Sequence, residues 1–376
     1  MKLPPHYYHF MTDALKLAHK GFYTTHPNPR VGCIIVKNDK IIGKGYHQYA
    51  GQPHAEVLAL RDAGYKAKNA TAYVTLEPCS HTGKTPPCAN ALINAGITKV
   101  IIAMQDPNPQ VSGNGIKKLR DAGVEVIVGV LEQQARELNK GFVKRMQYAL
   151  PWVRVKMAMS LDGRTAMKSG ESQWITARDA RQDVQKYRAA SDAILTAQGT
   201  VLADDPSLNV RLTKDDLGIE GEVRQPVRVV LDQDLQISPQ AKMLGLEGET
   251  WIYTCAENQK EKKQALKKQG AIIIELKPDK NNLLPLETVL KDLAKREINE
   301  VHTEAGQTLT GALLEQGLVD ELLIYIAPTL MGSDARGLFY LPSLQTMQDR
   351  IQLEIKDIRA IGRDWRIIAT PLNRPK

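Results

Sequence analysis

The sequence has little of what marks secreted and membrane proteins. Its 376 residues include four cysteines, too few for a disulfide framework, and this favours a reducing compartment. No apolar run approaches the length of a membrane span, and the first residues lack the apolar core of a signal peptide. We therefore expect a cytoplasmic protein that has no membrane partner.

The sequence also lacks two common nucleotide-binding patterns. It has no long runs of Lys and Arg interleaved with aromatics, and no G-x-G-x-x-G fingerprint of an ordinary dinucleotide-binding domain. The charge is nevertheless uneven, with a net charge of +9 in residues 1–150 and −1 in the remainder. A basic surface suits nucleic acids or phosphorylated small molecules. The missing runs favour the small phosphate, and a basic surface that contacts only water is the alternative.

What the sequence does contain is a histidine, a glutamate and two cysteines in one stretch. His54-Ala55-Glu56 is followed by Pro78-Cys79 and Pro87-Cys88. One imidazole and two thiolates are natural ligands of a catalytic zinc, whose fourth position stays open for water. Zinc lowers the pKa of that water toward neutrality, and Glu56 is placed to carry protons without being a ligand. The pattern follows the general signature of zinc deaminases, although the gap between the cysteines is longer.

Two simpler interpretations of these residues remain. His81, in the loop between the cysteines, would complete a structural zinc with four protein ligands, and the cysteines could also be two unconnected core residues. The flanking sequence favours catalysis. Residues 71–76 predict a buried strand that ends just before Cys79, and Cys88 begins a predicted helix, where the helix dipole favours a thiolate. Neither alternative gives Glu56 a role.

The length and the alternation of elements predict two α/β domains. A chain of 376 residues is too long for one ordinary core, and the best boundary lies at residues 146–151. We expect domains over 1–148 and 149–376, each with strands that alternate with helices. The predicted strands span residues 31–36, 71–76, 100–104, 124–128, 152–159, 191–196, 227–231, 250–253, 271–276 and 322–327.

Two stretches of the second half suggest a nucleotide site. Residues 300–304 predict a strand that leads into the glycine turn 305–311 and a helix, an arrangement that can hold a pyrophosphate on free backbone N–H groups. Residues 200–206 place polar groups after another strand. Glycine turns also join elements without any ligand, and paired acids before proline are usually a capping turn.

The motifs resemble those of a known family. In the first half these are His26-Pro27-Asn28-Pro29, His54-Ala55-Glu56 and the segment 77–88, and in the second half 160–164, 174–176, 201–206 and 304–306. Along nearly its full length the chain resembles the bifunctional deaminase–reductases of riboflavin biosynthesis. The resemblance implies a cytidine-deaminase-like three-layer domain followed by a dihydrofolate-reductase-like α/β domain. It implies zinc-dependent deamination of 2,5-diamino-6-ribosylamino-4(3H)-pyrimidinone 5′-phosphate, then NADPH-dependent reduction of the ribosyl group to ribityl.

The resemblance also implies roles for individual residues. His54, Cys79 and Cys88 match the ligands of one zinc per chain, and Glu56 matches the catalytic proton carrier. The matched contacts to the nicotinamide nucleotide are Ala158, Trp174, Thr200, Asp204 and the turn of Gly306, Gln307, Thr308, Leu309, Thr310, Gly311 and Ala312. The matched contacts to the pyrimidine ribosyl phosphate are Ser172, Arg188, Leu208, Arg211 and Glu304. Two arginines suit a phosphate, although each taken singly could be an exposed surface charge.

Three further residues are candidates on weaker grounds. Asn28 could hydrogen-bond the edge of a heterocycle, although asparagine between prolines is more often part of a turn. We expect His81 and Lys84 to reach the phosphate or ribose of the substrate, and a solvated lid is the alternative. The expected partners are phosphorylated pyrimidines and no nucleic acid. Whether the protein forms a homo-oligomer stays open, because the sequence does not determine how many copies associate.

Two other kinds of protein share some of these features. A deaminase of tRNA or nucleotides with an unrelated appendage would share the zinc residues but not the reductase motifs. A zinc module without catalytic activity would have a closed metal site and would leave Glu56 without a role.

Overall fold

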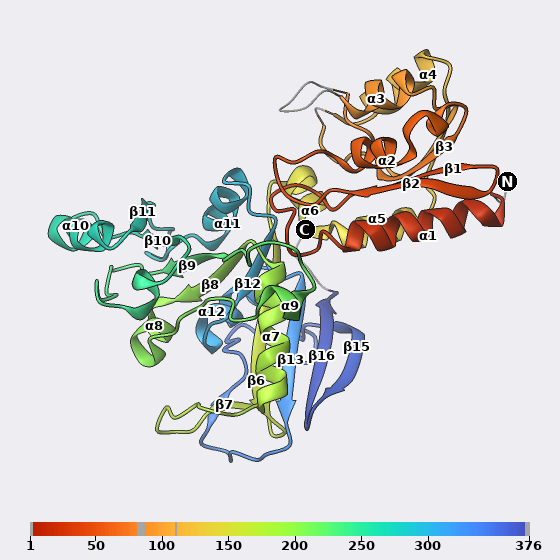
Figure 1. Cartoon of the computed structure of the whole chain (residues 1–376). Helices are drawn as coiled ribbons and strands as arrows, with labels where there is room; N and C mark the ends of the chain where they lie inside the picture. The colour runs from red at the N-terminus through yellow and green to blue at the C-terminus, as the bar shows by residue number, and fades with distance from the viewer. Residues whose placement is uncertain (1–2, 81–86, 110, 373–376) are drawn as a thin grey trace. The chain divides into compact units, whose positions relative to one another are not determined.

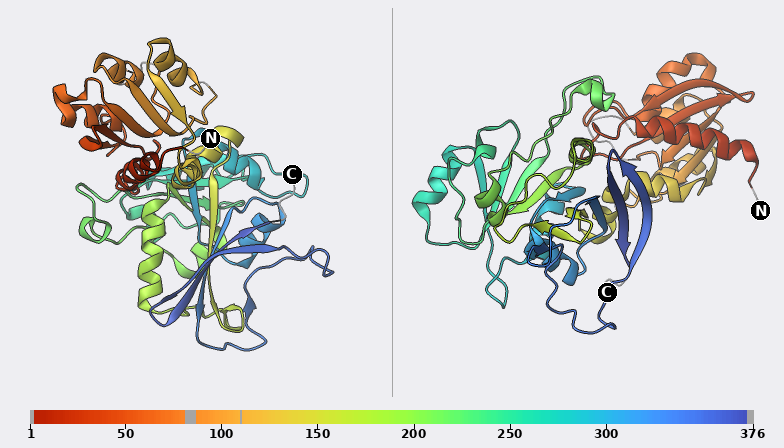
Figure 2. Two further views of the ribbon diagram at one scale, coloured as in Figure 1. Left: turned by 90° about the vertical axis from the view of Figure 1, so that its right-hand side faces the viewer. Right: turned by 90° about the horizontal axis from the view of Figure 1, so that it is seen from below.

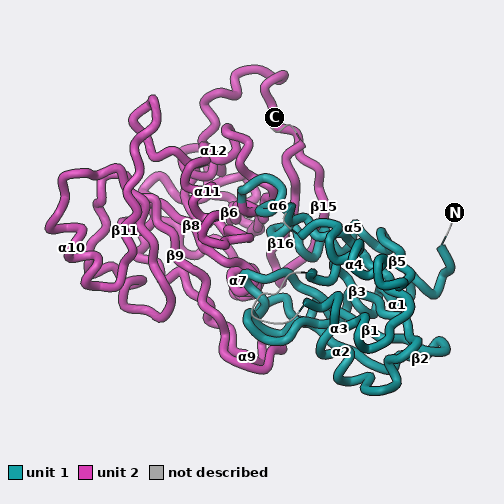
Figure 3. Tube along the Cα trace, turned by 90° about the horizontal axis from the view of Figure 1, so that it is seen from above, with its two compact units in different colours: residues 1–150 teal, residues 151–376 magenta. Residues whose placement is uncertain are grey.

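The computed structural model describes residues 3–80, 87–109 and 111–372, so His81 and Lys84 lie outside the described part. The chain divides into two compact units, residues 1–150 and 151–376 (Figure 3). Among the described residues, no helix combines the length and the apolar character needed to cross a membrane.

The first unit is a five-stranded sheet between two layers of helices (Figure 1). Its elements are α1 (Pro5–His19), β1 (Gly32–Lys37), β2 (Lys40–Tyr46), α2 (Ala55–Ala63), the 3₁₀-helix η1 (Gly64–Ala67), β3 (Thr71–Leu76), α3 (Cys88–Asn94), β4 (Lys99–Met104), α4 (Asn114–Asp121), β5 (Glu125–Val128), α5 (Glu132–Leu138) and α6 (Lys140–Tyr148). The strand order is β2-β1-β3-β4-β5, with β3, β4 and β5 parallel and β1 antiparallel to both neighbours.

The two faces of this sheet are buried by different helices. Alternate side chains of a strand point to opposite faces, so Ile34 and Cys33 enter different cores. Ile34 packs with α1 and α5, whereas Cys33 packs with α2, α3 and α4 and is fully buried. Cys33 is therefore a core residue of this unit.

Glycine allows α2 to approach the sheet closely enough to carry the site. A Cβ atom on Gly45 of β2 would lie 2.3 Å from the carbonyl oxygen of Ala55 and 2.5 Å from the nitrogen of Ala59. Any larger residue would push the first turns of α2 outward. This contact fixes the start of the helix, where His54 and Glu56 lie.

The second unit is built on a nine-stranded sheet. Its elements are β6 (Trp152–Ser160), β7 (Arg164–Ala166), α7 (Arg178–Ala190), β8 (Ala193–Ala197), α8 (Gln198–Asp204), α9 (Lys214–Leu217), β9 (Val227–Leu231), the 3₁₀-helix η2 (Lys242–Gly245), β10 (Thr250–Thr254), α10 (Lys260–Lys268), β11 (Ala271–Glu275), α11 (Leu286–Lys295), β12 (Glu300–Thr303), α12 (Gln307–Glu315), β13 (Glu321–Ala327), β14 (Arg336–Gly337), β15 (Leu353–Ile361) and β16 (Asp364–Pro371). The strand order is β11-β10-β9-β8-β12-β6-β13-β16-β15.

Most of this sheet is parallel. All neighbours from β11 through β13 run parallel, and the antiparallel hairpin of β15 and β16 completes one edge, drawn in dark blue (Figure 1, Figure 2). Helices α8 and α10 bury one face, with Val201 and Leu266 in the core. Helix α7 packs through Ala180 and Val184 against Leu323 and Tyr325 of β13.

The sheet face beneath α7 carries an unusual number of charges. Arg154 on β6 pairs in register with His302 on β12 and with Glu321 on β13. Arg154 is buried, donates a hydrogen bond to Glu321 and has Glu300 3.8 Å away. Buried charges are tolerated when each is near an opposite charge, and here Arg154 lies between two carboxylates. Glu304 follows the end of β12, close to these charged residues.

Candidate active sites

The histidine and the two cysteines of the first unit converge on one point. Nδ1 of His54 lies 3.3 Å from Sγ of Cys88 and 3.7 Å from Sγ of Cys79, and the three ligand atoms lie within 4.8 Å of one another. A tetrahedral zinc with bonds of 2.0–2.3 Å separates its ligands by about 3.5–3.8 Å. The residues therefore fit a zinc ion, with Nδ1 as the imidazole ligand.

Each ligand is held at the end of a regular element. His54 is the N-cap of α2 and has extended backbone angles, so it precedes the helix rather than belonging to it. Cys79 follows the end of β3, and Cys88 is the first residue of α3, as the sequence predicted. The backbone N–H of Cys88 donates to the sulfur of Cys79 at 3.3 Å. Hydrogen bonds with Cys88 and His54 lower the pKa of Cys79, which favours the thiolate that zinc requires.

Glu56 lies beside the ligands in a dry environment. Its side chain is only 3% exposed and belongs to the first turn of α2. Because His54 is the cap rather than part of the helix, the two side chains can reach the same point although they are two residues apart. Burial raises the pKa of Glu56 to about 7, and the neighbouring Cys79 thiolate adds to this increase. A carboxyl group with a pKa near neutrality can both accept and release a proton.

Two residues that the sequence interpretation missed support this site. Glu77, buried between β3 and Cys79, accepts hydrogen bonds from four backbone N–H groups, those of Asp106, Gly113, Gly115 and Ile116, at 2.9–3.2 Å. It anchors the loop before α4 to the turn that carries Cys79. The signal in the sequence was an acidic residue placed directly between the apolar strand 71–76 and Pro78-Cys79.

His47 is the second missed residue. Its ring lies 5.5 Å from that of His54, and Asn28 Nδ2 lies 3.1 Å from its Nε2 atom. Burial lowers the pKa of His47 to about 4, with a smaller contribution from His54. The neutral ring then donates through Nδ1 toward the carbonyl oxygen of Pro53, at 3.4 Å, and accepts from Asn28. Asn28 thus lies near the metal site, and its amide is oriented by His47.

The second unit contains a large cavity near the carboxyl ends of β8, β9 and β12. Its volume is about 1240 Å³, and such a position is where open α/β sheets bind ligands. The residues that the resemblance implied and that line it are Ala158, Ser172, Trp174, Arg188, Thr200, Asp204, Leu208, Arg211, Glu304, Gly306, Gln307, Thr308, Leu309 and Ala312. The fold brings these residues together from segments far apart in the sequence.

Two residues of the predicted glycine turn do not line this cavity. Thr310 is buried and its hydroxyl donates to the carbonyl oxygen of Gly306 at 3.2 Å. A Cβ atom on Gly311 would lie 2.0 Å from the carbonyl oxygen of Tyr340, so this glycine is needed for packing. Both positions fall on the side of α12 that faces the protein. Both acids of the pair line the cavity, and Asp205 also ends α8 and accepts a hydrogen bond from the backbone nitrogen of Lys242 at 2.9 Å.

Glu304 is the most strongly held polar group in the cavity. Arg188 donates to both carboxylate oxygens of Glu304, from Nε to Oε1 at 2.5 Å and from Nη2 to Oε2 at 2.9 Å. A third bond runs from Arg188 to the carbonyl oxygen of Asn209 at 2.9 Å. Burial by itself raises the pKa of Glu304, but the charge of Arg188 outweighs it and holds the pKa well below the usual value. Glu304 is therefore an anion at neutral pH.

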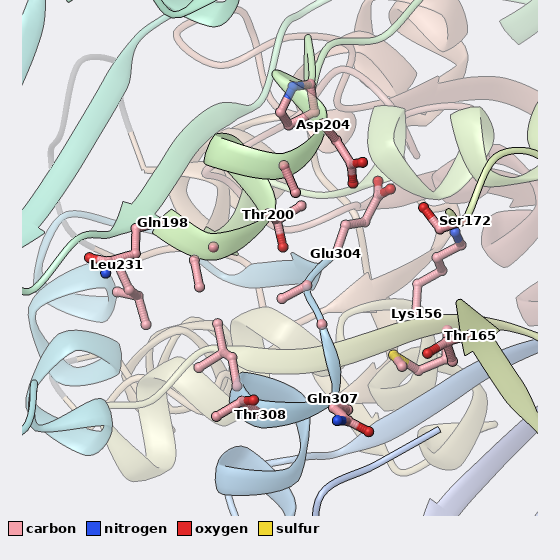
Figure 4. A pocket seen from close by; sticks show the side chains of 18 of the residues that line it. Lys156, Thr165, Ser172, Gln198, Thr200, Asp204, Leu231, Glu304, Gln307 and Thr308 are labelled. Atoms are coloured by element: carbon pink, nitrogen blue, oxygen red, sulfur yellow. The ribbon is translucent and has the colours of Figure 1, made fainter. Parts of the chain in front are cut away.

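Lys156 is a cavity residue that the sequence interpretation missed. It belongs to β6 and lies in the same part of the cavity as Glu304 and Ser172, with Thr200 and Asp204 on the α8 side (Figure 4). Burial and the charge of Arg188 lower its pKa, while Glu304 opposes the decrease. The described residues give its ammonium group no hydrogen-bond partner. A lysine between the apolar residues Val155 and Met157 of a strand was the signal in the sequence.

Trp174 stands at the mouth of the cavity. Its ring is 69% exposed, and the guanidinium of Arg181 lies 4.6 Å from the ring centroid. Arg181 also donates to the carbonyl oxygen of Thr176 at 2.6 Å, so one side chain of α7 holds both the ring and its loop. An exposed flat ring next to a cavity can stack on a heterocycle.

A metal site of the deaminase type and a reductase-like cavity in one chain define a bifunctional class of enzyme. Residues 5–104 match the family model for the cytidine and deoxycytidylate deaminase zinc-binding region, and residues 151–367 match the RibD C-terminal domain. The riboflavin biosynthesis protein RibD of Escherichia coli (strain K12) is 52% identical over 95% of this chain and 97% of its own length. The Haemophilus influenzae RibD is 51% identical over 96% of each chain.

Solved structures agree with these matches. The structure of Acinetobacter baumannii RibD, form 1, superposes with a TM-score of 0.89 at 45% identity, over 98% of this chain and 99% of that one. A deaminase/reductase from Thermotoga maritima gives a TM-score of 0.84 at 33% identity, over 97% and 98%. The chain belongs to the RibD family of bifunctional riboflavin-biosynthesis deaminase–reductases.

Membership of this family confirms the predicted fold classes, the two activities and the cofactors. The first unit is a zinc-dependent deaminase of the cytidine-deaminase fold, and the second is an NADPH-dependent reductase. The substrates are small-molecule pyrimidines. The interpretation as a non-catalytic zinc module was wrong.

Proposed function

We propose that this enzyme deaminates 2,5-diamino-6-ribosylamino-4(3H)-pyrimidinone 5′-phosphate and then reduces the ribosyl group of the product to ribityl. The observation that carries the proposal is the pairing, in one chain, of the His54, Cys79 and Cys88 cluster beside buried Glu56 with a cavity centred on Glu304. We assign the first reaction to residues 1–148 and the second to residues 149–376.

In the deaminase site, His54, Cys79 and Cys88 would hold one zinc, which supplies an activated water for attack on the ring carbon. Glu56 accepts a proton from that water and returns one to the departing exocyclic amine, so that ammonia leaves and a carbonyl forms. Its pKa of about 7 suits both transfers. Asn28, oriented by His47, binds an edge of the pyrimidine, and His81 and Lys84 bind its sugar phosphate.

In the reductase site, bound NADPH would supply the hydride that reduces C1′ of the ring-opened sugar imine. The N-terminus of α12, at Gly306 to Leu309, offers free N–H groups to the pyrophosphate, and Trp174 stacks on the nucleotide. Arg188 and Arg211 face the phosphate end of the substrate. Glu304 binds N–H groups of the pyrimidine, and Lys156 supplies the proton that the imine nitrogen takes up.

A product assay tests the whole proposal. The purified protein should convert the diamino compound into the deaminated ribosyl compound without NADPH, and into the ribityl compound with it, as measured by mass spectrometry. Release of ammonia from RNA instead of from the pyrimidine phosphate would support the tRNA deaminase alternative. A single product that is the same with and without NADPH would contradict the two-step assignment.

We also propose that the protein is a cytoplasmic homo-oligomer that binds neither nucleic acid nor membranes. The β15–β16 hairpin supports self-association, because its register places Ile355, Ile358 and Trp365 on one face, and these side chains are 51–55% exposed. Apolar faces on an edge hairpin are often covered by a partner. Ile358→Glu should lower the molar mass measured by light scattering, and an unchanged mass would place the interface elsewhere.

A further inference from the structure

His302 is a buried, titratable group for which the reactions described above have no use. It lies on β12, the central strand, is fully buried, and stacks on Tyr187 of α7 with the rings 12° from parallel. Within the described residues, neither of its ring nitrogens has a hydrogen-bond partner. A buried imidazole without a hydrogen bond is destabilising, so a second state in which the ring is hydrogen-bonded would be favoured.

The neighbours of His302 show which partner it can reach. Arg154 from β6 and Arg188 from α7 are cations and accept nothing, and Ile194 from β8 is apolar. Glu304 follows the end of β12, two residues beyond His302, and is the acceptor whose contact with the imidazole the structure shows. Its Oε1 atom lies 3.4 Å from Nε2 of His302, just beyond a well-formed hydrogen bond.

In this structure Arg188 competes for that oxygen. Its Nε atom is 2.5 Å from Oε1 of Glu304, and its other nitrogen holds Oε2. Arg188 also lines the cavity together with Arg211, whose side chain is exposed and bonded to Asn209 at 3.3 Å. Two guanidinium groups bind a phosphate in the cavity more strongly than they bind a single carboxylate.

We propose that His302 is a positioning residue for the reductase reaction: it bonds Glu304 and keeps this carboxylate directed into the cavity when the substrate phosphate engages Arg188. This inference rests on the roles proposed above for Glu304 and Arg188. Without a second donor, Glu304 would lose its orientation at the moment it must bind the substrate. His302 supplies that donor from a position that the substrate does not occupy.

Three variants of the full-length enzyme separate positioning from packing. His302→Leu removes the donor, whereas His302→Gln keeps an N–H group near the place of Nε2. Thr303→Val is the matched control, since Thr303 is buried on the same strand but points to the opposite face. We expect His302→Leu to lower kcat for NADPH oxidation with the deaminated substrate about ten-fold, the rate equivalent of one ordinary hydrogen bond. His302→Gln should restore most of the rate, and Thr303→Val should match the wild type.

A spectroscopic measurement tests the bond directly in the unmodified enzyme. The chain has eight histidines, so the ¹⁵N signals of His302 in histidine-labelled protein can be assigned by their loss in His302→Gln. Ribose 5-phosphate serves as the probe, because it carries the phosphate without the pyrimidine. On saturation we expect the Nε2 signal to move toward that of a hydrogen-bonded N–H.

The outcomes distinguish this inference from the proposed function. An Nε2 signal that stays unchanged, or equal losses of rate and thermal stability in His302→Leu and Thr303→Val, would show that His302 only fills the core. A Glu304→Gln variant that still reduces the substrate would instead overturn the proposed role of Glu304 itself. Loss of activity in Glu304→Gln together with full activity in His302→Leu would reject the positioning role of His302 and leave the proposed role of Glu304 intact.

Discussion

The two active sites of this enzyme are built in different ways. The deaminase ligands lie between His54 and Cys88, at the ends of three adjacent elements, and their half-buried or buried side chains leave little room for rearrangement. The reductase cavity takes residues from β6 through β14, spans about 1240 Å³, and includes exposed residues such as Trp174 and Arg211. The first site stabilises one reactive water, whereas the second must hold two large molecules. Substitutions in the first site should therefore abolish nearly all activity, whereas those in the second should reduce activity by different amounts.

The largest effect should follow from removing a metal ligand. Cys88→Ala leaves two ligands, and we expect the purified protein to lose its zinc and all measurable deamination. Reduction of the deaminated substrate should continue, because no zinc ligand belongs to the second unit. Metal analysis together with ammonia and NADPH assays checks this. Stoichiometric zinc in Cys88→Ala would rule out the ligand assignment.

Glu56→Gln should separate proton transfer from metal binding. The amide keeps the shape of the side chain but cannot carry protons, so deamination should fall by roughly 10²–10⁴-fold while zinc is retained. The variant should still oxidise NADPH with the deaminated pyrimidine but not with the diamino compound. If zinc were lost with the activity, Glu56 would be a ligand. If reduction of the deaminated compound also stopped, the two sites would act as one coupled unit.

The same contrast explains what the sequence could predict. The zinc residues follow local rules, a strand end and two helix starts, so spacing and the resemblance were enough to bring His54, Cys79 and Cys88 together. Lys156 and His302 were missed because their roles depend on which residues lie beside them on neighbouring strands, and strand order is not visible in local patterns. Thr310 and Gly311 were included because the motif alone does not tell which side of α12 faces the cavity.

In the reductase site, Lys156→Met should have the strongest effect. The substitution keeps the length and apolar stem of the side chain but removes the ammonium group that we propose as the proton donor, so we expect kcat for reduction to fall about 10²-fold. The KM for NADPH and the release of ammonia should change little. Stopped-flow measurement of NADPH oxidation checks the rate. A raised KM for the substrate at unchanged kcat would mean that Lys156 binds the substrate and transfers no proton.

The ion pair of Glu304 and Arg188 should be visible in the pH dependence of stability. The pKa of Glu304 in the folded protein lies well below its ordinary value of 4.5. The pair therefore stabilises the fold above about pH 4.5, and this contribution is lost as the pH falls toward the folded pKa. Removing one partner of such a buried pair costs about 3 kcal/mol, or several degrees in Tm. The Tm difference between wild type and Glu304→Gln should thus be large at pH 7 and shrink at pH 3.5, and a constant difference would contradict the pairing.

The smallest effect concerns the ring at the cavity mouth and sharpens the contrast between the sites. Arg181 holds Trp174 by a cation–π contact at 4.6 Å, and contacts of this kind at exposed sites contribute about 0.5–1 kcal/mol. Arg181→Met should therefore raise the KM for NADPH roughly two- to five-fold and leave kcat nearly unchanged, since in the role we propose for Trp174 its ring positions the nucleotide but takes no part in hydride transfer. Arg181→Lys is the matched control, because it keeps a cation over the ring, and it should behave like the wild type. Fluorescence titration with NADPH measures the binding constant independently of turnover. A change in kcat without a change in KM would mean that the loop carrying Trp174 shapes the transition state, and the second site would then be as closely organised as the first.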